Sequence, residues 1–168
     1  MSIMSYTTQS TQLDIYYMQQ ALVLAQQALE QDEVPIGALV VDYACDTITG
    51  IIIGYGYNQT EQRKSQSRHA EVLAIEQAGL YKQDWRLDGC TLYVTLQPCL
   101  MCISLVGLSR IERIVYGAQS PLFGYDLDKE LLPDLYKRQI KGVTSAVEAE
   151  QAELLLKKFF KTKRTHRE

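Results

Sequence analysis

The sequence is poor in several residue types that mark particular protein classes. It has four cysteines, two histidines, four prolines and one tryptophan among 168 residues. Four cysteines at irregular spacing do not make the framework of a disulfide-rich secreted domain. No stretch approaches the roughly 18 consecutive apolar residues of a membrane span, and the first residues lack the charged start and apolar run of a signal peptide. These absences predict a cytoplasmic protein without a membrane segment.

Charge is scarce overall but unevenly placed. The net charge is −3, which gives no global sign of a nucleic-acid partner. Residues 157–168 hold six Lys or Arg and one Glu, so this end carries +5 and the preceding chain −8. A basic end can be a solvated helix terminus that complements the helix dipole. It can equally be an electrostatic contact for phosphates.

Hydrophobic periodicity predicts an alternation of helices and strands. We expect strands at residues 36–41, 47–58, 91–96, 111–118 and 141–147, and helices at 13–29, 69–79, 99–109 and 131–136. Gly79 is the predicted C-cap of the second helix. This order is typical of a layered α/β/α domain. We predict a disordered N-terminus at residues 1–12 and a single domain at 13–168, ending in a basic helix at about 147–166.

Two of the cysteines stand three residues apart directly after a proline. Pro98 suits the first turn of a helix, which places Cys99 and Cys102 on one face of that turn. The positive end of the helix dipole favours their thiolates. The pair alone can be a metal site, a redox pair or two buried small side chains. Cys45 and Cys90 stand alone and are interpreted as inert buried thiols.

His69 and Glu71 begin another apolar helix, about thirty residues before the cysteines. Alone, His69 could be a cap or a surface residue. H-x-E on one helix followed by P-C-x-x-C on the next is, however, the signature of zinc-dependent nucleobase deaminases. Neutral His69 and the thiolates of Cys99 and Cys102 suit one Zn²⁺ per chain and leave a coordination position open. Glu71 is predicted to move protons rather than to bind the metal.

The sequence resembles the bacterial tRNA-specific adenosine deaminases of the cytidine-deaminase-like superfamily. The likeness runs through residues 33–41, 68–75, 91–102, 109–118 and 159–164. It implies a five-stranded mixed sheet flanked by helices, a homodimer, and conversion of adenosine to inosine at the wobble position of a tRNA anticodon. It assigns zinc binding to His69, Cys99 and Cys102, and proton transfer to Glu71. It also implies that Asn58 hydrogen-bonds the nucleoside and that Val34 lines the base pocket.

Phe160 and Lys161 are predicted to contact RNA from the final helix, because an aromatic ring among cations suits a single-stranded loop. The resemblance departs from the family at three places. Residues 66–68 lack a proline, Gln97 replaces an acidic residue, and the loop at 119–124 lacks two cations. None of these changes touches the zinc ligands or Glu71.

Two other functions stay open on the sequence alone. The altered loop keeps deamination of a free base or nucleotide, such as guanine, cytosine or deoxycytidylate, as the alternative. A non-catalytic RNA-binding subunit with a structural zinc is a third interpretation, against which the intact Glu71 argues.

Overall fold

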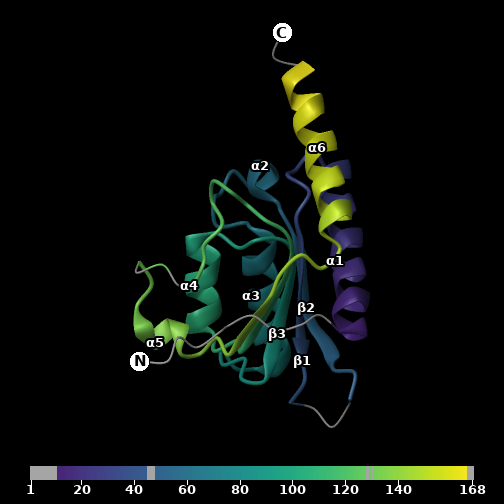
Figure 1. Cartoon of the computed structure of the whole chain (residues 1–168). Helices are drawn as coiled ribbons and strands as arrows, with labels where there is room; N and C mark the ends of the chain where they lie inside the picture. Colours follow the sequence, from purple (N-terminus) through teal and green to yellow (C-terminus); the bar gives the residue numbers. More distant parts are fainter. Residues whose placement is uncertain (1–10, 45–47, 128, 130, 166–168) are drawn as a thin grey trace.

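Five strands form one mixed sheet in the order β2-β1-β3-β4-β5 (Figure 1). Strand β1 is antiparallel to β2 and β3, whereas β3, β4 and β5 run parallel. The carboxyl ends of β2, β3 and β4 therefore meet at one end of the sheet, together with the start of β1. The strand bounds are β1 Gly37–Asp42, β2 Ile51–Tyr57, β3 Cys90–Leu96, β4 Arg113–Ala118 and β5 Gly142–Thr144.

Helices cover both faces of the sheet, as predicted. α1 (Gln12–Glu30) and α6 (Ala149–Thr165) lie side by side on one face. α3 (Ala70–Lys82) and α4 (Leu100–Leu108) cover the other. Two short helices, α2 (Thr60–Arg63) and α5 (Asp134–Lys137), lie in connections. The last turns of α6 extend beyond the rest of the molecule (Figure 1).

The structure, a computed structural model, describes residues 11–44, 48–127, 129 and 131–165. Residues 1–10 of the N-terminus predicted to be disordered, and Cys45, predicted to be an inert thiol, lie outside the described residues. Thr11 and Gln12, the last two residues of that predicted segment, are instead the N-cap and first residue of α1. Within the described residues, no helix is both long and apolar enough to cross a membrane. Cys90 is fully buried, and burial raises the pKa of its thiol to about 12, which keeps it protonated and inert.

Several predicted element ends differ from the structure by a few residues, and three of them have a clear local cause. α1 begins at Gln12 because Thr11 and Asp14 cap it reciprocally in a capping box. Gly79 stays inside α3 and is not its C-cap. The helix ends instead at Gln83, which is left-handed (φ 55°), while the amide of Asp84 donates to the carbonyl of Gly79. β5 is only three residues long because the chain turns at Ala146 (φ 61°) toward α6.

Alternate side chains of β1 enter two separate cores. Ala38 and Val40 pack on the side of α3 and α4, and Leu39 and Val41 pack against α1. This explains the continuous apolar run in the sequence, since the strand is buried on both faces. On β2, a Cβ at Gly56 would lie 2.7 Å from the carbonyl oxygen of Ala70. Glycine there lets the first turn of α3 approach the sheet closely.

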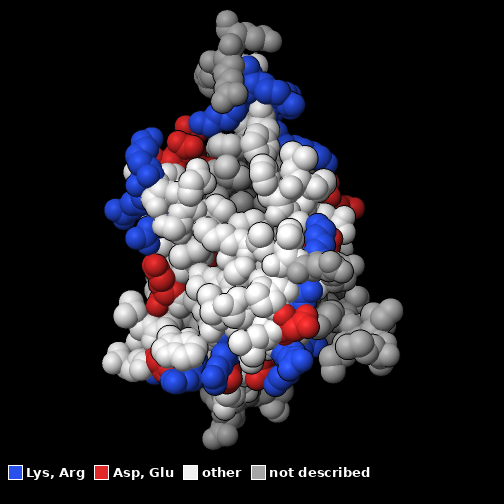
Figure 2. All heavy atoms as spheres, turned by 90° about the vertical axis from the view of Figure 1, so that its left-hand side faces the viewer, with Lys and Arg blue, Asp and Glu red and all other residues white. Residues whose placement is uncertain are grey.

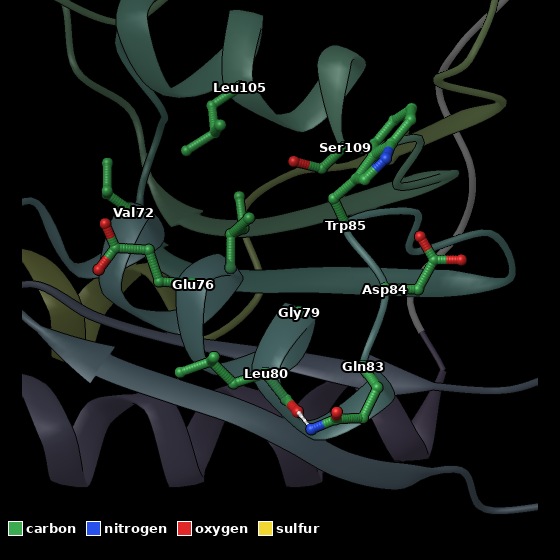
Figure 3. A pocket seen from close by; sticks show the side chains of 10 residues that line it. Val72, Glu76, Gly79, Leu80, Gln83, Asp84, Trp85, Leu105 and Ser109 are labelled. Atoms are coloured by element: carbon green, nitrogen blue, oxygen red, sulfur yellow. Dashed lines mark hydrogen bonds between the residues drawn. The ribbon is translucent and has the colours of Figure 1, made fainter.

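The outer surface of α3 and α4 is largely uncharged. Figure 2 shows Lys, Arg, Asp and Glu around the border of this face and few of them at its centre. A groove between the two helices runs from Val72 and Glu76 to Trp85 and Ser109, with Leu105 above it (Figure 3). Leu80, Trp85 and Leu108 are exposed there. α4 has no charged residue at all, which is typical of a helix that is buried in an assembly.

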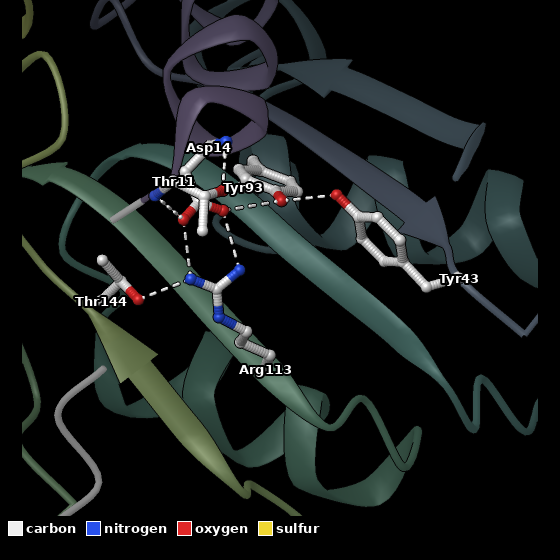
Figure 4. Close-up of polar contacts among 6 residues, drawn as sticks. All are labelled: Thr11, Asp14, Tyr43, Tyr93, Arg113 and Thr144. Carbon is white, nitrogen blue, oxygen red and sulfur yellow. Dashed lines mark hydrogen bonds and ion pairs between the residues drawn. The ribbon is translucent and has the colours of Figure 1, made fainter. Parts of the chain in front are cut away.

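A buried polar network joins α1 to the sheet (Figure 4). Arg113 donates to both carboxylate oxygens of Asp14, at 2.7 and 2.8 Å, and also to the hydroxyl of Thr144. Tyr93 donates to Asp14 at 3.0 Å and shares a 2.8 Å hydrogen bond with Tyr43. Burial raises the pKa of Asp14, but the hydrogen bonds from Arg113 and Thr11 outweigh it, so the pKa lies below its ordinary value.

Candidate active site and metal centre

The predicted metal ligands stand at the starts of two helices that meet at one end of the sheet. His69 is the N-cap of α3 and Cys99 is the N-cap of α4, with Cys102 inside the first turn of α4. α3 follows β2 and α4 follows β3, and these strands run in the same direction on either side of β1. The topology therefore brings together residues that lie thirty positions apart.

The three side chains converge closely enough to share one ion. Nδ1 of His69 lies 3.8 Å from Sγ of Cys99 and 3.5 Å from Sγ of Cys102. All three ligand atoms lie within 4.8 Å of one another. Tetrahedral Zn²⁺, with bonds of about 2.3 Å to sulfur and about 2.0 Å to nitrogen, sets such atoms about 3.6 Å apart. The donor set and its spacing fit zinc.

The two thiols differ in acidity. The hydrogen bond from Cys102, aided by His69, lowers the pKa of Cys99 to about 4. The hydrogen bond to Cys99 and burial together raise the pKa of Cys102 well above its ordinary value. The hydrogen bond to Cys99 raises the pKa of His69. A metal ion that takes both sulfurs as thiolates displaces the proton of Cys102.

Glu71 lies in the first turn of α3 and is 4% exposed. Burial raises the pKa of its carboxyl group above the ordinary value, although its own backbone N–H and the charge of His69 act in the opposite direction. Glu71 is not a member of the described ligand group. A carboxyl group with a raised pKa beside a metal site is suited to accept and return protons near neutral pH.

A cavity of about 600 Å³ opens over this centre. His69, Glu71 and Cys99 lie in its wall, together with Val34, Asn58 and Phe160. The side-chain oxygen of Asn58 accepts a hydrogen bond from the backbone N–H of Ala70 at 2.9 Å. That bond caps α3 and engages the oxygen of the Asn58 amide, not its NH₂ group. Lys161 does not line the cavity and is exposed on α6 beside Phe160.

Leu156, which joins Phe160 from α6 at the cavity, is not predicted as a site residue from the sequence. The loop at 119–123, which the sequence marks only as a departure from the family, forms one side of the opening. It reaches the cavity because it directly follows the carboxyl end of β4, which is parallel to β3. Glu33 is also not predicted as a site residue from the sequence. Its fully buried carboxylate accepts hydrogen bonds from the backbone of Glu61 and Gln62 and from the hydroxyl of Thr60. It therefore holds α2, whose residues line the cavity.

Comparisons with known proteins agree with this geometry. The family described as "Cytidine and deoxycytidylate deaminase zinc-binding region" matches residues 11–118. A tRNA-specific adenosine deaminase of Bacillus subtilis is 40% identical over 139 residues, or 82% of this chain and 83% of that protein. One from Streptococcus pyogenes is 41% identical over 109 residues, and the match covers 65% of each protein, so the chain spans just under two thirds of this relative.

A solved structure shares the fold. It comes from a study of A-to-I editing by tRNA:A34 deaminases at the wobble position of transfer RNA. The TM-score is 0.70 and the identity 34%, over 84% of this chain and 99% of that one. Together with the matched zinc-binding region, these relatives place the chain in the cytidine and deoxycytidylate deaminase family, among the tRNA-specific adenosine deaminases.

Proposed function

We propose that the protein is a zinc-dependent enzyme that hydrolytically deaminates adenosine to inosine at the wobble position of a tRNA anticodon. The observation that carries the proposal is the buried Glu71 carboxylate beside His69, Cys99 and Cys102, at the wall of one open cavity. The named activity of the relatives agrees with this chemistry.

One Zn²⁺ per chain, held by His69, Cys99 and Cys102, is the proposed cofactor. Bound zinc would supply the acidity that makes water a nucleophile near neutral pH, lowering its pKa from about 15.7 to about 7. The hydrogen bond from Ala70 to Asn58 fixes the start of α3, so His69 and Glu71 keep their positions. The site is therefore organised before substrate arrives.

Glu71 is the proposed proton carrier. Its carboxylate accepts a proton from the attacking water and delivers it to the ring nitrogen next to the reacting carbon. It then transfers the second proton of that water to the departing amino group. Ammonia leaves, a carbonyl remains on the ring, and Glu71 returns to its starting form. Its burial keeps bulk water from competing for these protons.

Two residues are proposed to hold the nucleoside. The NH₂ group of Asn58 donates a hydrogen bond to the bound nucleoside, and Val34 packs against the base. A base must be unpaired, or flipped out of its stack, to reach a catalytic group at the bottom of a cavity. A tRNA anticodon loop offers such a base.

α6 supplies the proposed contact to the RNA backbone. Lys157 and Lys163 form ion pairs with Glu153 and Asp32. Within the described part of the chain, no ion pair is found for Lys158, Lys161 or Arg164, and these three follow one another at helical spacing. Lys161 and Arg164 follow Phe160, which lines the cavity, by one and four positions along the helix. These two cations are therefore the nearer candidates to bind phosphates beside the opening.

A homodimer acting in the cytoplasm is part of the proposal. The largely uncharged face of α3 and α4 (Figures 2 and 3) is the surface that a second copy would cover. Met101, Leu105 and Leu108 form an apolar stripe along α4 that packs only in part against its own chain. A two-fold pair would bury the same stripe of each copy.

The direct test is inosine formation in an unmodified tRNA whose anticodon begins with adenosine. We expect the zinc-loaded protein to convert that one position, as measured by mass spectrometry of the RNA. Free guanine, cytosine and deoxycytidylate are tested as substrates in parallel. The loop at 119–124 carries no cation, which keeps a small substrate as the alternative. Turnover of a free base without inosine in tRNA would replace this proposal with the alternative.

A further inference from the structure

The loop that follows β4, residues 119–124, exposes large apolar side chains at the mouth of the active-site cavity. We call it the lip. Leu122 is 86% exposed and Phe123 is 75% exposed, yet both line the cavity. No residue of the lip carries a charge. Folding alone does not require large apolar side chains to be exposed at this position.

The lip is anchored to the start of α4. Gly124 pairs with Cys99 in an antiparallel bridge, and the amide of Tyr125 donates to the carbonyl of Pro98 at 2.9 Å. Within the lip, the amide of Gly124 donates to the carbonyl of Ser120 at 2.8 Å. Phe123 is therefore presented on a backbone that is fixed relative to the metal ligands.

Gln97 adds a second anchor. Its carbonyl oxygen accepts a hydrogen bond from the amide of Ser120, and its NH₂ group donates to Asp126 at 2.6 Å. A carboxylate at this position could accept from Ser120 but could not donate to Asp126. Gln97 and the lip both depart from the family pattern, and the hydrogen bonds of Gln97 hold the lip in place.

A second aromatic ring faces the same opening. Phe160 on α6 lines the cavity, is 49% exposed, and packs edge to face on Phe159 with ring centroids 5.3 Å apart. The rings of Phe123 and Phe160 and the side chain of Leu122 therefore lie at the entrance to a cavity that holds Glu71 in its wall. Because the backbone beside Phe123 is anchored and the ring of Phe160 packs on Phe159, less entropy is lost when a ligand stacks there.

We propose that Phe123, with Leu122 and Phe160, forms a stacking subsite for the unpaired nucleobase adjacent to the target nucleotide. The inference rests on the proposed function, because it takes an RNA strand as the substrate. When the target base lies in the cavity, the neighbouring base, which is joined to it by one phosphate, must lie at the mouth of the cavity. Stacking on aromatic rings suits an unpaired base of any sequence, whereas the uncharged lip offers no cation for a phosphate.

The test compares stem-loop RNAs that carry the target adenosine and either intact neighbours or an abasic site on its 5′ or 3′ side. With the zinc-loaded wild-type protein, removing the stacked neighbour should lower kcat/KM by about fivefold to 150-fold. Phe123→Ala should show the same loss on the intact RNA, mainly through KM, and no further loss on that abasic RNA. Phe123→Tyr should retain the wild-type values.

Leu154→Ala is the matched control, since Leu154 is an exposed leucine of α6 outside this cavity. It should leave all three RNAs unaffected. An equal effect of Phe123→Ala on intact and abasic RNAs, or a change in the mass of the assembly, would overturn the subsite and indicate packing or a protein contact. Inosine would still form in the intact RNA in that case. No inosine in any RNA would instead overturn the proposed function, and the subsite with it.

Discussion

At the scale of single residues, Glu71 differs from the proposed metal ligands in its chemistry, because its buried carboxyl group can carry protons. We predict that Glu71→Gln lowers the rate of deamination by at least about a hundredfold, because proton transfer by a positioned acid and base contributes roughly 10²–10⁴. The amide keeps the size of the side chain and removes its ability to accept a proton. Single-turnover inosine formation at saturating RNA measures this rate.

The variant should keep its zinc and its fold. Zinc content by mass spectrometry and the Tm should match those of the wild type, since Glu71 is not a member of the ligand group. A variant that retains turnover would refute the role of Glu71 as proton carrier. A variant that loses zinc would show that the carboxylate supports the metal instead.

Cys102 is the most buried of the three ligands. We predict that Cys102→Ser reduces zinc from one equivalent per chain to a small fraction, because a serine hydroxyl is a far weaker ligand than a thiolate. A chelator should lower the Tm of the wild type but not that of the variant, since bound metal stabilises only the folded state. Cys90→Ser is the control: this buried thiol lies outside the ligand group and should leave zinc content unchanged.

The convergence of His69, Cys99 and Cys102 could be predicted from the sequence, because the H-x-E and P-C-x-x-C motifs each place these residues at the start of a helix. The contacts of Glu33 and Gln97 could not. Glu33 acts through backbone groups 28 and 29 positions away, and Gln97 reaches Asp126 across 29 positions. No residue close to Glu33 or Gln97 in the sequence indicates these distant partners. The position of Phe123 at the cavity could not be predicted either, because it depends on β4 ending beside the cavity.

At the scale of elements, the contact between α1 and the sheet depends on Asp14 and Arg113. We predict that Asp14→Asn lowers the free energy of unfolding by roughly 3 kcal/mol, because removing one partner of a buried ion pair leaves the other uncompensated. Urea unfolding at pH 7 measures the change. Glu153→Gln breaks an exposed ion pair with Lys157 and should cost under about 1 kcal/mol.

The effect of Asp14 should depend on pH in one direction. Its folded-state pKa lies below the unfolded value of about 3.9. The stabilisation is therefore complete above the unfolded pKa and is lost as pH falls through the folded pKa. The difference between wild type and Asp14→Asn should be constant from about pH 5 to pH 8. It should shrink below about pH 4. A difference that grows on acidification would contradict the ion pair as its source.

Elements were easier to predict in kind than in extent. A continuous apolar run identified β1, since both faces of this strand are buried. The last strand was predicted too long because its end is set by left-handed residues, Ala146 and Glu148, which no glycine marks. The predicted end of α3 was wrong because Gly79, a glycine, lies inside the helix and does not end it.

At the scale of the whole molecule, the largely uncharged face of α3 and α4 is the surface that we propose a second copy covers. We predict that Leu108→Glu converts a homodimer into a monomer, because a two-fold interface would bury two added carboxylates close together without partners. Leu108 is 50% exposed in the single chain, so the monomer itself should tolerate the change. Light scattering measures the mass, and the Tm at low concentration checks that the monomer is folded.

Leu154→Glu is the matched control, because Leu154 is 64% exposed on α6, on the opposite side of the sheet. It should remain dimeric. A wild-type protein that is monomeric at every concentration would refute the interface. Should Leu108→Glu be monomeric and still convert tRNA at the wild-type rate, the cavity would be complete within one chain. Should it lose activity while keeping zinc and its Tm, the second copy would contribute to holding the RNA, since Glu71 and the metal ligands all belong to one chain.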